Sequence, residues 1–245
     1  MEPIRIFLSS PGDVAQERRI AERVVKRLNA EFPEVKLEPY FWEYEPMLIT
    51  KDYQEQIPPT SGFDIVICIL WSRMGSRLHT KYTRSDGTAY RSGTEFEFVD
   101  AVEGQKRNEG TPNILVWINK TQPLIPLEPE DEHMERLREL KAFLEEWTRD
   151  GEEGTFKGAV NRYGRLDEFE DKLEVKLRKL IGARLVESAP FSSTPTTITW
   201  TEGSPFRGLE TFEFEHAPVF FGRTAAIADA IKSLRGQTQD HNFSF

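Results

Sequence analysis

Apolar and polar positions along residues 1–182 follow two patterns that alternate with each other. Short apolar runs, which predict strands, occur at 4–8, 35–41, 64–70, 113–118 and, more briefly, 155–160. Apolar residues at helical spacing predict four helices. The first ends near residue 31, the second covers 93–106, the third includes 137–147 and the fourth includes 166–180. This alternation is typical of an α/β fold, with a parallel sheet of about five strands and helices on both faces.

The third apolar run, Asp64-Ile-Val-Ile-Cys-Ile-Leu70, shows no alternation of polar and apolar residues. Such a run is typical of a parallel strand that is buried on both faces. Open sheets of this kind bind ligands beside the carboxyl ends of their strands. The residues that follow those ends are therefore the candidates for chemistry.

The composition is that of an ordinary globular chain of 245 residues, 38% hydrophobic and 30% charged, with a formal net charge of −9. This acidic balance argues against nucleic acid as a partner, since nucleic-acid binders present a basic face. No apolar run approaches the ~20 residues of a membrane span, and the N-terminus does not resemble a signal peptide. We therefore expect a cytoplasmic protein that does not bind a membrane. With one cysteine, Cys68, and four scattered histidines, neither a disulfide nor a metal site is expected.

The character of the chain changes after residue 182, where we expect the first domain, 1–182, to end. Residues 190–201 are rich in Ser, Thr and Pro, which is typical of a linker, placed here at 183–203. The remaining segment, 204–245, is too short to bury a core of its own. It is expected to be the first part of a second domain.

Glu97 is the candidate catalytic residue. It lies in the run Tyr90-Arg-Ser-Gly-Thr-Glu-Phe-Glu-Phe-Val-Asp-Ala101, at the start of the helix after the third strand. In one interpretation it belongs to a capping box and accepts a hydrogen bond from the N–H of Thr94. In the other, its carboxylate faces a ligand at the carboxyl edge of the sheet. Glu95 lies about 200° around the helix from Glu97, so these two residues do not form an acid–base pair.

The turn after the first strand is a second candidate for ligand binding. Ser10-Pro-Gly-Asp13 has the spacing of a capping box with Pro at the first helical position. Alternatively, the free N–H groups of this helix start, together with Ser9 and Ser10, receive a phosphate or a ribose. The two interpretations are compatible with each other.

Residues 73–91 hold the only concentrated positive charge, from the basic residues Arg73, Arg77, Lys81, Arg84 and Arg91. Ser85-Asp-Gly-Thr88 predicts a two-residue hairpin turn, so one interpretation of the segment is a solvated hairpin. In the other, Arg73 or Arg77 neutralises a diphosphate. Trp42 and Trp71 both follow strand ends, where each either packs against the core or stacks on a nucleobase or pyridine ring.

Several motifs are absent from the chain. It has no Gly-x-x-x-x-Gly-Lys-Ser/Thr sequence, and therefore no nucleotide triphosphatase site within these 245 residues. Gly-x-Gly-x-x-Gly and Gly-x-Ser-x-Gly are missing as well. Neither hydride transfer nor acyl transfer is supported.

Four motifs, in order, resemble a family of TIR-like domains that occur at the N-termini of STAND-type signalling ATPases. They are Phe7-Leu-Ser-Ser-Pro-Gly-Asp-Val-Ala-Gln-Glu-Arg18, Trp42-Glu43, Asp64-Ile-Val-Ile-Cys-Ile-Leu-Trp-Ser-Arg-Met-Gly75 and Ser92-Gly-Thr-Glu-Phe-Glu97. The resemblance covers residues 1–182. The segment that starts at Ser204-Pro-Phe-Arg-Gly-Leu-Glu and includes Phe220-Phe-Gly-Arg223 looks like the beginning of the STAND module, whose phosphate loop is expected after Phe245.

The resemblance implies a flavodoxin-like fold and an effector domain similar to those of bacterial antiviral proteins, which act when the full protein oligomerises. Enzymatic TIR domains hydrolyse NAD at the nicotinamide–ribose bond with a glutamate on the helix after the third strand, a position that Glu97 matches. NAD is then the expected substrate, no cofactor is expected in this chain, and ATP and Mg²⁺ are expected only in the downstream module. The substrate-binding residues expected with Glu97 are Ser9, Ser10, Asp13, Trp42, Trp71, Arg73, Gly75 and Thr94.

A single glutamate suits this reaction. Nicotinamide leaves as a neutral pyridine, so no second carboxylic acid is needed to protonate it, in contrast to ordinary glycosides. The glutamate can stabilise the developing oxocarbenium charge or orient the ribose hydroxyls. Two alternatives remain: a TIR-like module that only recruits or oligomerises, with Glu97 as a cap, and an enzyme similar to nucleoside deoxyribosyltransferases, which also use one glutamate.

Overall fold

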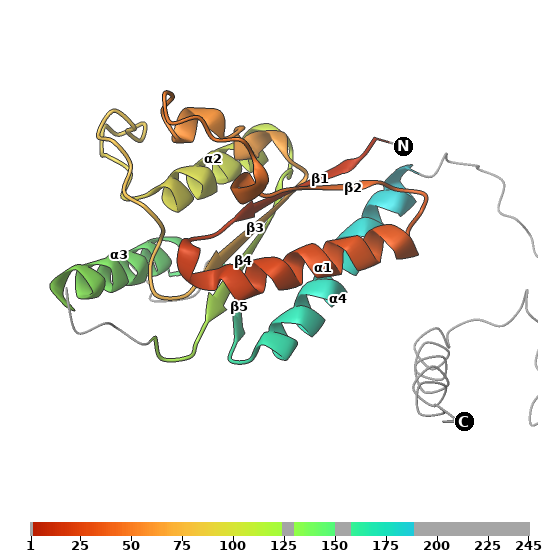
Figure 1. Ribbon diagram of the computed structural model, residues 1–245. Coiled ribbons are helices and arrows are strands. Elements are labelled where there is room, and N and C mark those ends of the chain that lie inside the picture. Colours follow the sequence, from red (N-terminus) through yellow and green to blue (C-terminus); the bar gives the residue numbers. More distant parts are fainter. Residues whose placement is uncertain (1, 124–129, 150–157, 189–245) are drawn as a thin grey trace, which may run out of the picture. The chain divides into compact units, whose positions relative to one another are not determined.

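Five parallel strands form a single sheet in the computed structural model, which describes residues 2–123, 130–149 and 158–188 (Figure 1). The strands are β1 Ile4–Ser9, β2 Leu37–Tyr40, β3 Ile65–Leu70, β4 Asn113–Asn119 and β5 Val160–Tyr163. Their order in the sheet, β2-β1-β3-β4-β5, is that of the flavodoxin-like α/β fold. The predicted parallel sheet is therefore confirmed.

Helices cover both faces of this sheet, as the alternating pattern predicts. On one face, α1 (Ala15–Glu31) and α4 (Leu166–Ser188) lie side by side (Figure 1). On the other face lie α2 (Gly93–Arg107) and α3 (Glu130–Thr148). The sheet is thus the middle one of three layers.

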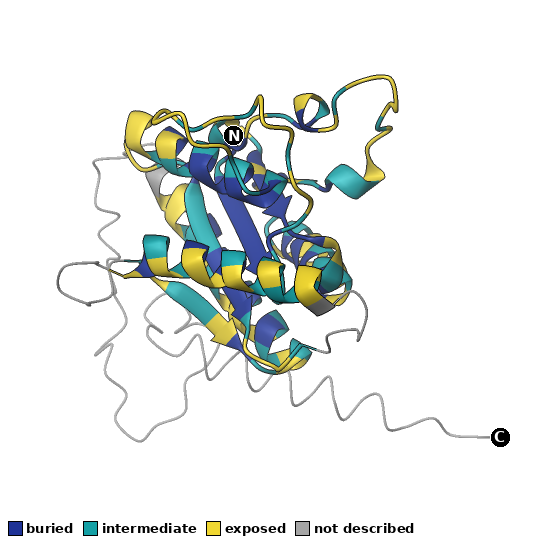
Figure 2. Ribbon diagram, turned by 90° about the vertical axis from the view of Figure 1, so that its left-hand side faces the viewer, coloured by how far each residue is buried: buried dark blue, intermediate teal, exposed yellow. Residues whose placement is uncertain are grey.

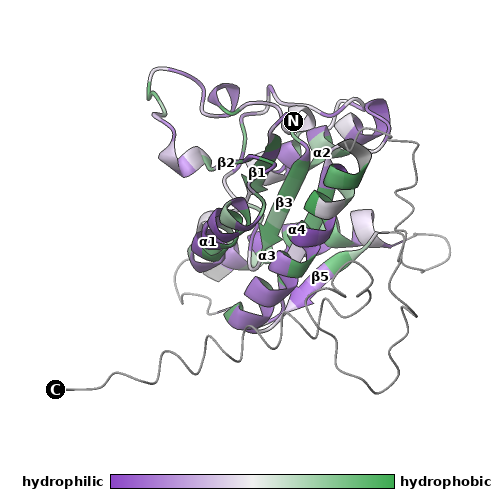
Figure 3. Ribbon diagram, turned by 90° about the vertical axis from the view of Figure 1, so that its right-hand side faces the viewer, coloured by the Kyte–Doolittle hydropathy of each residue, from purple (hydrophilic) through white to green (hydrophobic). Residues whose placement is uncertain are grey.

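The central strand β3 is buried along its whole length, which explains its uninterrupted apolar sequence. Its side chains alternate between the two layers. Ile67 and Ile69 pack with residues of α1 and α4, whereas Cys68 and Leu70 pack with residues of α2 and α3. Figure 2 shows the middle of the sheet as buried, and Figure 3 shows the same strands as hydrophobic between helices with hydrophilic outer faces.

The observed elements differ from the predicted ones at their ends. β2 is shorter than the predicted 35–41, and the last strand begins at Val160, where the prediction of 155–160 ends. Residues 150–157 lie outside the described part of the chain. α4 continues to Ser188, beyond the predicted domain end at 182, because Leu185 still packs against the core.

Residues 183–188 of the predicted linker, 183–203, belong to α4. The rest of that linker and the predicted second domain, 204–245, lie outside the described residues. Among the residues that are described, no helix combines the length and the apolar character that crossing a membrane requires.

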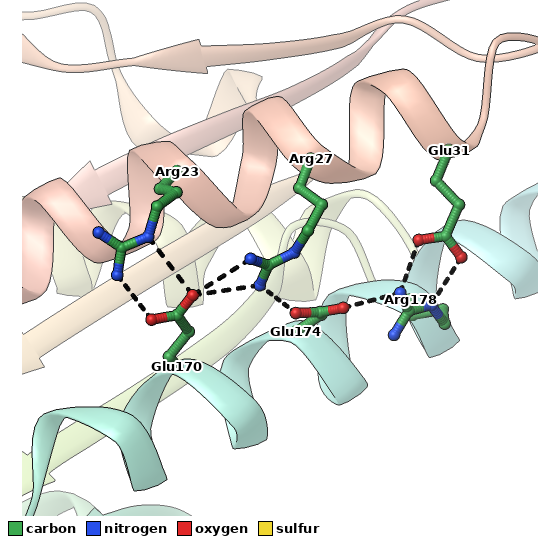
Figure 4. A network of polar contacts seen from close by, with 6 residues as sticks. All are labelled: Arg23, Arg27, Glu31, Glu170, Glu174 and Arg178. Carbon is green, nitrogen blue, oxygen red and sulfur yellow. Dashed lines mark hydrogen bonds and ion pairs between the residues drawn. The ribbon is translucent and has the colours of Figure 1, made fainter. Parts of the chain in front are cut away.

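A ladder of ion pairs joins α1 to α4 (Figure 4). Each residue faces an opposite charge on the other helix, and the ladder consists of Arg23, Arg27 and Glu31 of α1 and of Glu170, Glu174 and Arg178 of α4. Because these side chains are partly exposed, each pair adds little stability by itself. The ladder instead selects which faces of the two helices meet, while the apolar residues beneath it supply most of the stability.

On the other face, α2 lies very close to the short 3-10 helix Thr60–Gly62. A Cβ on Gly104 would lie 2.8 Å from the Cα of Ser61. One turn earlier, Asp100 Oδ2 accepts hydrogen bonds from the N–H of Ser61 at 2.7 Å and from the hydroxyl of Thr60 at 2.9 Å. These contacts fix the position of the helix that carries Glu97.

Gly104→Ala is therefore expected to lower the free energy of unfolding by about 2 kcal/mol, because backbone atoms must move to admit the methyl group. The gain in helix propensity, about 1 kcal/mol, offsets only part of this loss. Gly182→Ala in α4 is the matched control, since among the described residues no atom other than those of its chain neighbours and its own helix backbone lies within 4 Å of the added Cβ. Urea unfolding compares both variants with the parent, and equal stability of the two variants would show that the contact with Ser61 yields easily.

Candidate active site

Glu97 lies one turn into α2, and its side chain is directed toward the end of β1. The residue is only 6% exposed. Its Oε2 accepts a 2.5 Å hydrogen bond from the hydroxyl of Ser9, the last residue of β1. Ser9 pairs in register with Cys68 of β3. The carboxylate thus lies at the carboxyl edge of the sheet between β1 and β3, which is the switch point where flavodoxin-like folds bind ligands.

The start of α2 is capped by other residues, so the capping box predicted for Thr94 and Glu97 is wrong. Ser92 is the N-cap, and its Oγ accepts a 3.2 Å hydrogen bond from the N–H of Glu95. Glu95 Oε2 in turn accepts a 2.6 Å bond from the N–H of Arg91. The same Ser/Thr-to-Glu spacing occurs two residues earlier in the sequence, and that earlier pair forms the cap. Glu97 is consequently not needed to satisfy the helix start.

A pocket of about 460 Å³ opens at this edge of the sheet, and Glu97 is part of its wall. The sequence-predicted residues that also line it are Ser10, Trp42, Arg73, Gly75 and Thr94. The loop after β2 and the segment 76–82 complete the wall, with residues that include Tyr53, Gln54, Leu78, His79 and Tyr82. The structure therefore brings together most of the residues that were expected to bind substrate.

Burial changes the acidity of Glu97. Removal from water raises its pKa to about 7, because the charged form loses its hydration. Hydrogen bonds from Ser9 and Gln54 act in the opposite direction, while the nearby negative charge of Glu43 raises the pKa further. Near neutral pH, the carboxyl group therefore exists in both protonation states.

Gly75 and Thr94 meet at the wall of the pocket. Gly75 has a φ of 95°, which side chains rarely adopt, and a Cβ there would lie 3.0 Å from Oγ1 of Thr94. The segment after β3 can therefore follow this path against α2 only with glycine at position 75.

Arg73 is the least satisfied cation of the pocket. It donates no hydrogen bond to a described residue, and its buried Nε lies 3.6 Å from Oδ1 of Asp13. A Cβ on Gly12 would lie 3.0 Å from Nη2 of Arg73, so glycine lets the guanidinium approach the loop after β1. Arg77, the other residue proposed to neutralise a diphosphate, pairs with Glu135 and Glu139 of α3.

Three of the predicted residues do not line the pocket. Ser9 lies behind Glu97 and acts through its hydrogen bond. Asp13 Oδ2 accepts bonds from the N–H of Ser72 at 3.1 Å and from its hydroxyl at 2.7 Å, which ties the loop after β1 to the end of β3. Trp71 packs with the α1–α4 layer, and its Nε1–H donates to the carbonyl of Thr121 at 3.0 Å.

The turn after β1 also differs from its prediction, and the capping box proposed for Ser10 to Asp13 is wrong. A 3-10 turn, Gly12–Val14, precedes α1, and neither helix start has a side-chain cap. The loop is held by Arg18 instead, whose Nη1 donates to Ser10 Oγ at 3.0 Å and to the carbonyl of Pro11 at 2.9 Å.

A hairpin forms within residues 73–91, but its loop has three residues and is not the predicted two-residue turn, because the N–H of Arg84 donates to the carbonyl of Thr88 at 2.7 Å. Its antiparallel bridge joins Thr83 and Ala89, and the turn closes with a hydrogen bond from the N–H of Gly87 to the carbonyl of Arg84. The tight turn thus lies one residue earlier than Ser85–Thr88. The hairpin is not simply solvated, because most of its cations pair with acids of other elements, among them Arg84 and Arg91 with Glu95 and Glu146.

Sequence reasoning missed four residues that shape the site: Arg18, Glu43, Tyr53 and Gln54. Each contacts Glu97 or the pocket wall from a segment that is distant in sequence or irregular in structure. Glu43 and Arg18 both occur within the quoted motifs, but their pairing across the fold leaves no local pattern.

Comparison of the chain with protein-family models, curated proteins and solved structures gives no match. In the described residues, no group of three or more His, Cys, Asp or Glu side chains is arranged to hold a metal ion. The chemistry of the site is therefore argued from its own residues.

Proposed function

We propose that this chain is an effector domain that hydrolyses NAD at the nicotinamide–ribose bond, with Glu97 as the catalytic residue. The observation that carries the proposal is the buried Glu97 carboxylate, bonded to Ser9 in the wall of the pocket at the switch point of the sheet. Ser92 and Glu95 accept the hydrogen bonds at the start of α2, so Glu97 is not needed as a cap. A role toward a ligand therefore accounts for its burial.

The geometry suits cleavage of a cationic glycosidic bond. As the bond to nicotinamide breaks, positive charge develops on the ribose, and a carboxylate in a water-poor wall interacts strongly with that charge. The departing nicotinamide takes the bonding electron pair and becomes neutral, so it needs no proton. Water then attacks the ribose carbon and gives its proton to Glu97 or to solvent.

Other pocket residues offer contacts for a dinucleotide. Arg73 has N–H groups with no hydrogen-bond partner among the described residues and can bind phosphate oxygens. Trp42, which packs edge-on against Tyr53, offers an aromatic surface for a ring of the substrate. The resemblance to N-terminal effectors of STAND-type ATPases supports a site that becomes active when the full protein oligomerises.

Product analysis tests the proposal. Purified protein, at a series of concentrations, is incubated with NAD and separately with nucleosides, and released bases are measured by chromatography. Nicotinamide release from NAD, rising more than linearly with protein concentration, is the expected result. Base release from nucleosides alone would favour the deoxyribosyltransferase-like alternative. No release from either substrate, including from the assembled full-length protein, would contradict an enzymatic role and favour a recruitment module.

A further inference from the structure

Arg18 of α1 and Glu43 of the loop after β2 form an ion pair beside the pocket. Arg18 Nε lies 2.8 Å from Glu43 Oε1, and the two side chains are 14% and 22% exposed. Pairs this far from solvent are screened less than surface pairs, but each ion must also recover the cost of its lost hydration. The pair therefore calls for an explanation beyond ordinary surface electrostatics.

The arginine connects this pair to the wall of the pocket. While Nε faces Glu43, Nη1 donates to three oxygens of the loop after β1: Ser10 Oγ at 3.0 Å, the Pro11 carbonyl at 2.9 Å and the Ser10 carbonyl at 3.3 Å. Ser10 and Pro11 line the pocket. A planar guanidinium that is fixed on two sides holds this loop more firmly than a flexible lysine could.

Glu43 is the less satisfied partner. Both of its carboxylate oxygens are buried, and neither accepts a hydrogen bond from another described residue. Burial raises the pKa of Glu43, and a hydrogen bond from its own backbone N–H and the charge of Arg18 counteract the rise. A buried carboxylate whose only partner from another residue is one ion pair is costly, so its retention suggests a use for the negative charge.

That charge acts on the proposed catalytic group. Glu43 is the one ionised side chain that contributes to the raised pKa of Glu97. The titratable or polar groups that face Glu97 from the elements around it are Ser9 of β1, Cys68 of β3, Tyr40 of β2, and Glu43, Tyr53 and Gln54 of the loop after β2. The Cys68 thiol and both tyrosines have raised pKa values and are neutral at pH 7.

We propose that Arg18 and Glu43 are a positioning pair for the reaction at Glu97: Arg18 fixes the pocket wall at Ser10 and Pro11, and Glu43 fixes Arg18 and holds a second negative charge near the reacting carboxylate. Neither residue needs to touch the reacting bond. The catalytic consequence rests on the proposed function, whereas the effect on the charge of Glu97 does not.

The test compares Glu43→Gln with Arg18→Gln. Glu43→Gln removes the like charge, which is the smallest of the causes that set the pKa of Glu97, so the midpoint for ionisation of Glu97 should fall by about half a pH unit. Arg18→Gln leaves two unneutralised carboxylates in one site, so the apparent midpoint should rise by a similar amount. Arg23→Gln is the matched control, because Arg23 lies on the same helix but pairs with Glu170 in the partly exposed ladder.

Two readouts separate this inference from the proposed function. The first is a carbon-13 NMR titration of the glutamate side chains, with Glu97→Gln used to assign the Glu97 signal, and it requires no catalysis. The second is the pH dependence of nicotinamide release, whose acidic limb should move with the NMR midpoint. Arg18→Gln should also raise KM more than it lowers kcat, because the wall at Ser10 loosens.

Shifts in opposite directions support the pair, since loss of a merely structural contact does not move the midpoint up in one variant and down in the other. Shifts of the same sign, or none, would overturn the inference even if NAD is hydrolysed. If the ionisation midpoint of Glu97 shifts as expected but no NAD is hydrolysed, the inference about Arg18 and Glu43 is supported and the enzymatic proposal is refuted. If either single variant fails to fold, the double variant Arg18→Gln/Glu43→Gln leaves no unpaired charge, and its midpoint should still fall below that of the parent.

Discussion

Glu97→Gln is expected to slow nicotinamide release by at least about a hundredfold, the scale on which loss of one positioned electrostatic group acts. Glutamine has the shape of the protonated acid and can still accept the hydrogen bond from Ser9, so the pocket should keep its form. Only the negative charge is lost, which in the proposed reaction faces the developing oxocarbenium ion. Steady-state release of nicotinamide measures the effect, and Glu103→Gln, on an exposed position of the same helix, is the control.

The same substitution is expected to reduce activity but not the stability of the folded protein. The pKa of Glu97 is about 7 in the folded protein against an ordinary value of 4.5, because burial disfavours the charged form. The folded state therefore binds a proton that the unfolded state has lost, and stability falls as the pH rises from about 4.5 through 7. Glu97→Gln does not undergo this loss, which is on the order of 3 kcal/mol when complete. The variant should be at least as stable as the parent at pH 8, with the difference vanishing near pH 4.

These two outcomes together distinguish catalysis from structure. A variant that is inactive but more stable at pH 8 matches a functional group retained at a cost in stability. A variant that is both inactive and strongly destabilised would instead point to a structural carboxylate. Unchanged activity in a correctly folded Glu97→Gln protein would refute the catalytic role outright.

Fold class could be predicted from the sequence because it is encoded in periodicity. The uninterrupted apolar run predicts that β3 is buried on both faces, and the helical spacing of apolar residues predicts that α1 is buried on one face. Both patterns involve only residues that are close together in the sequence. The position of Glu97 at the carboxyl edge of the sheet could be predicted for the same reason, since it depends only on element order.

Other features of the site depend on choices that the local sequence leaves open. Thr94/Glu97 and Ser92/Glu95 have the same capping-box spacing, and only the packing of α2 on the sheet selects the second pair. Trp71 follows a strand end, as expected, but it packs with the α1–α4 layer and not at the pocket.

The ion pairs of the basic segment 73–91 could not be predicted from the local sequence either. Its neighbours in sequence include a single acid, Asp86, which suggests solvated charge. Its partners in the structure come from α2, from α3 and from the loop after β2. These acids lie far from most of the basic residues in sequence, and the fold brings them together. Whether a charge is free or paired is a property of tertiary contacts, and composition alone does not determine it.

The buried member of that charge network gives the largest expected effect on stability. Glu95 is fully buried, and its carboxylate pairs with both Arg84 and Arg91 of the hairpin while it also accepts the N–H bond of Arg91. Glu146 of α3 pairs with the same two arginines from the solvent side, where its side chain is 36% exposed. Glu95 thus joins the start of α2 to the segment that lines the pocket.

Glu95→Gln is expected to lower the free energy of unfolding by about 3 kcal/mol, because two arginines lose their buried counter-charge. Glu146→Gln removes the same charge from a site that water reaches, and should cost only about 1 kcal/mol. Urea unfolding measures both losses, and hydrogen exchange of the amides in 76–91 should quicken more in the Glu95 variant, because the hairpin loses its tie to α2. Equal losses in the two variants would mean that burial adds nothing to this ion pair, and that the hairpin is held by contacts other than Glu95.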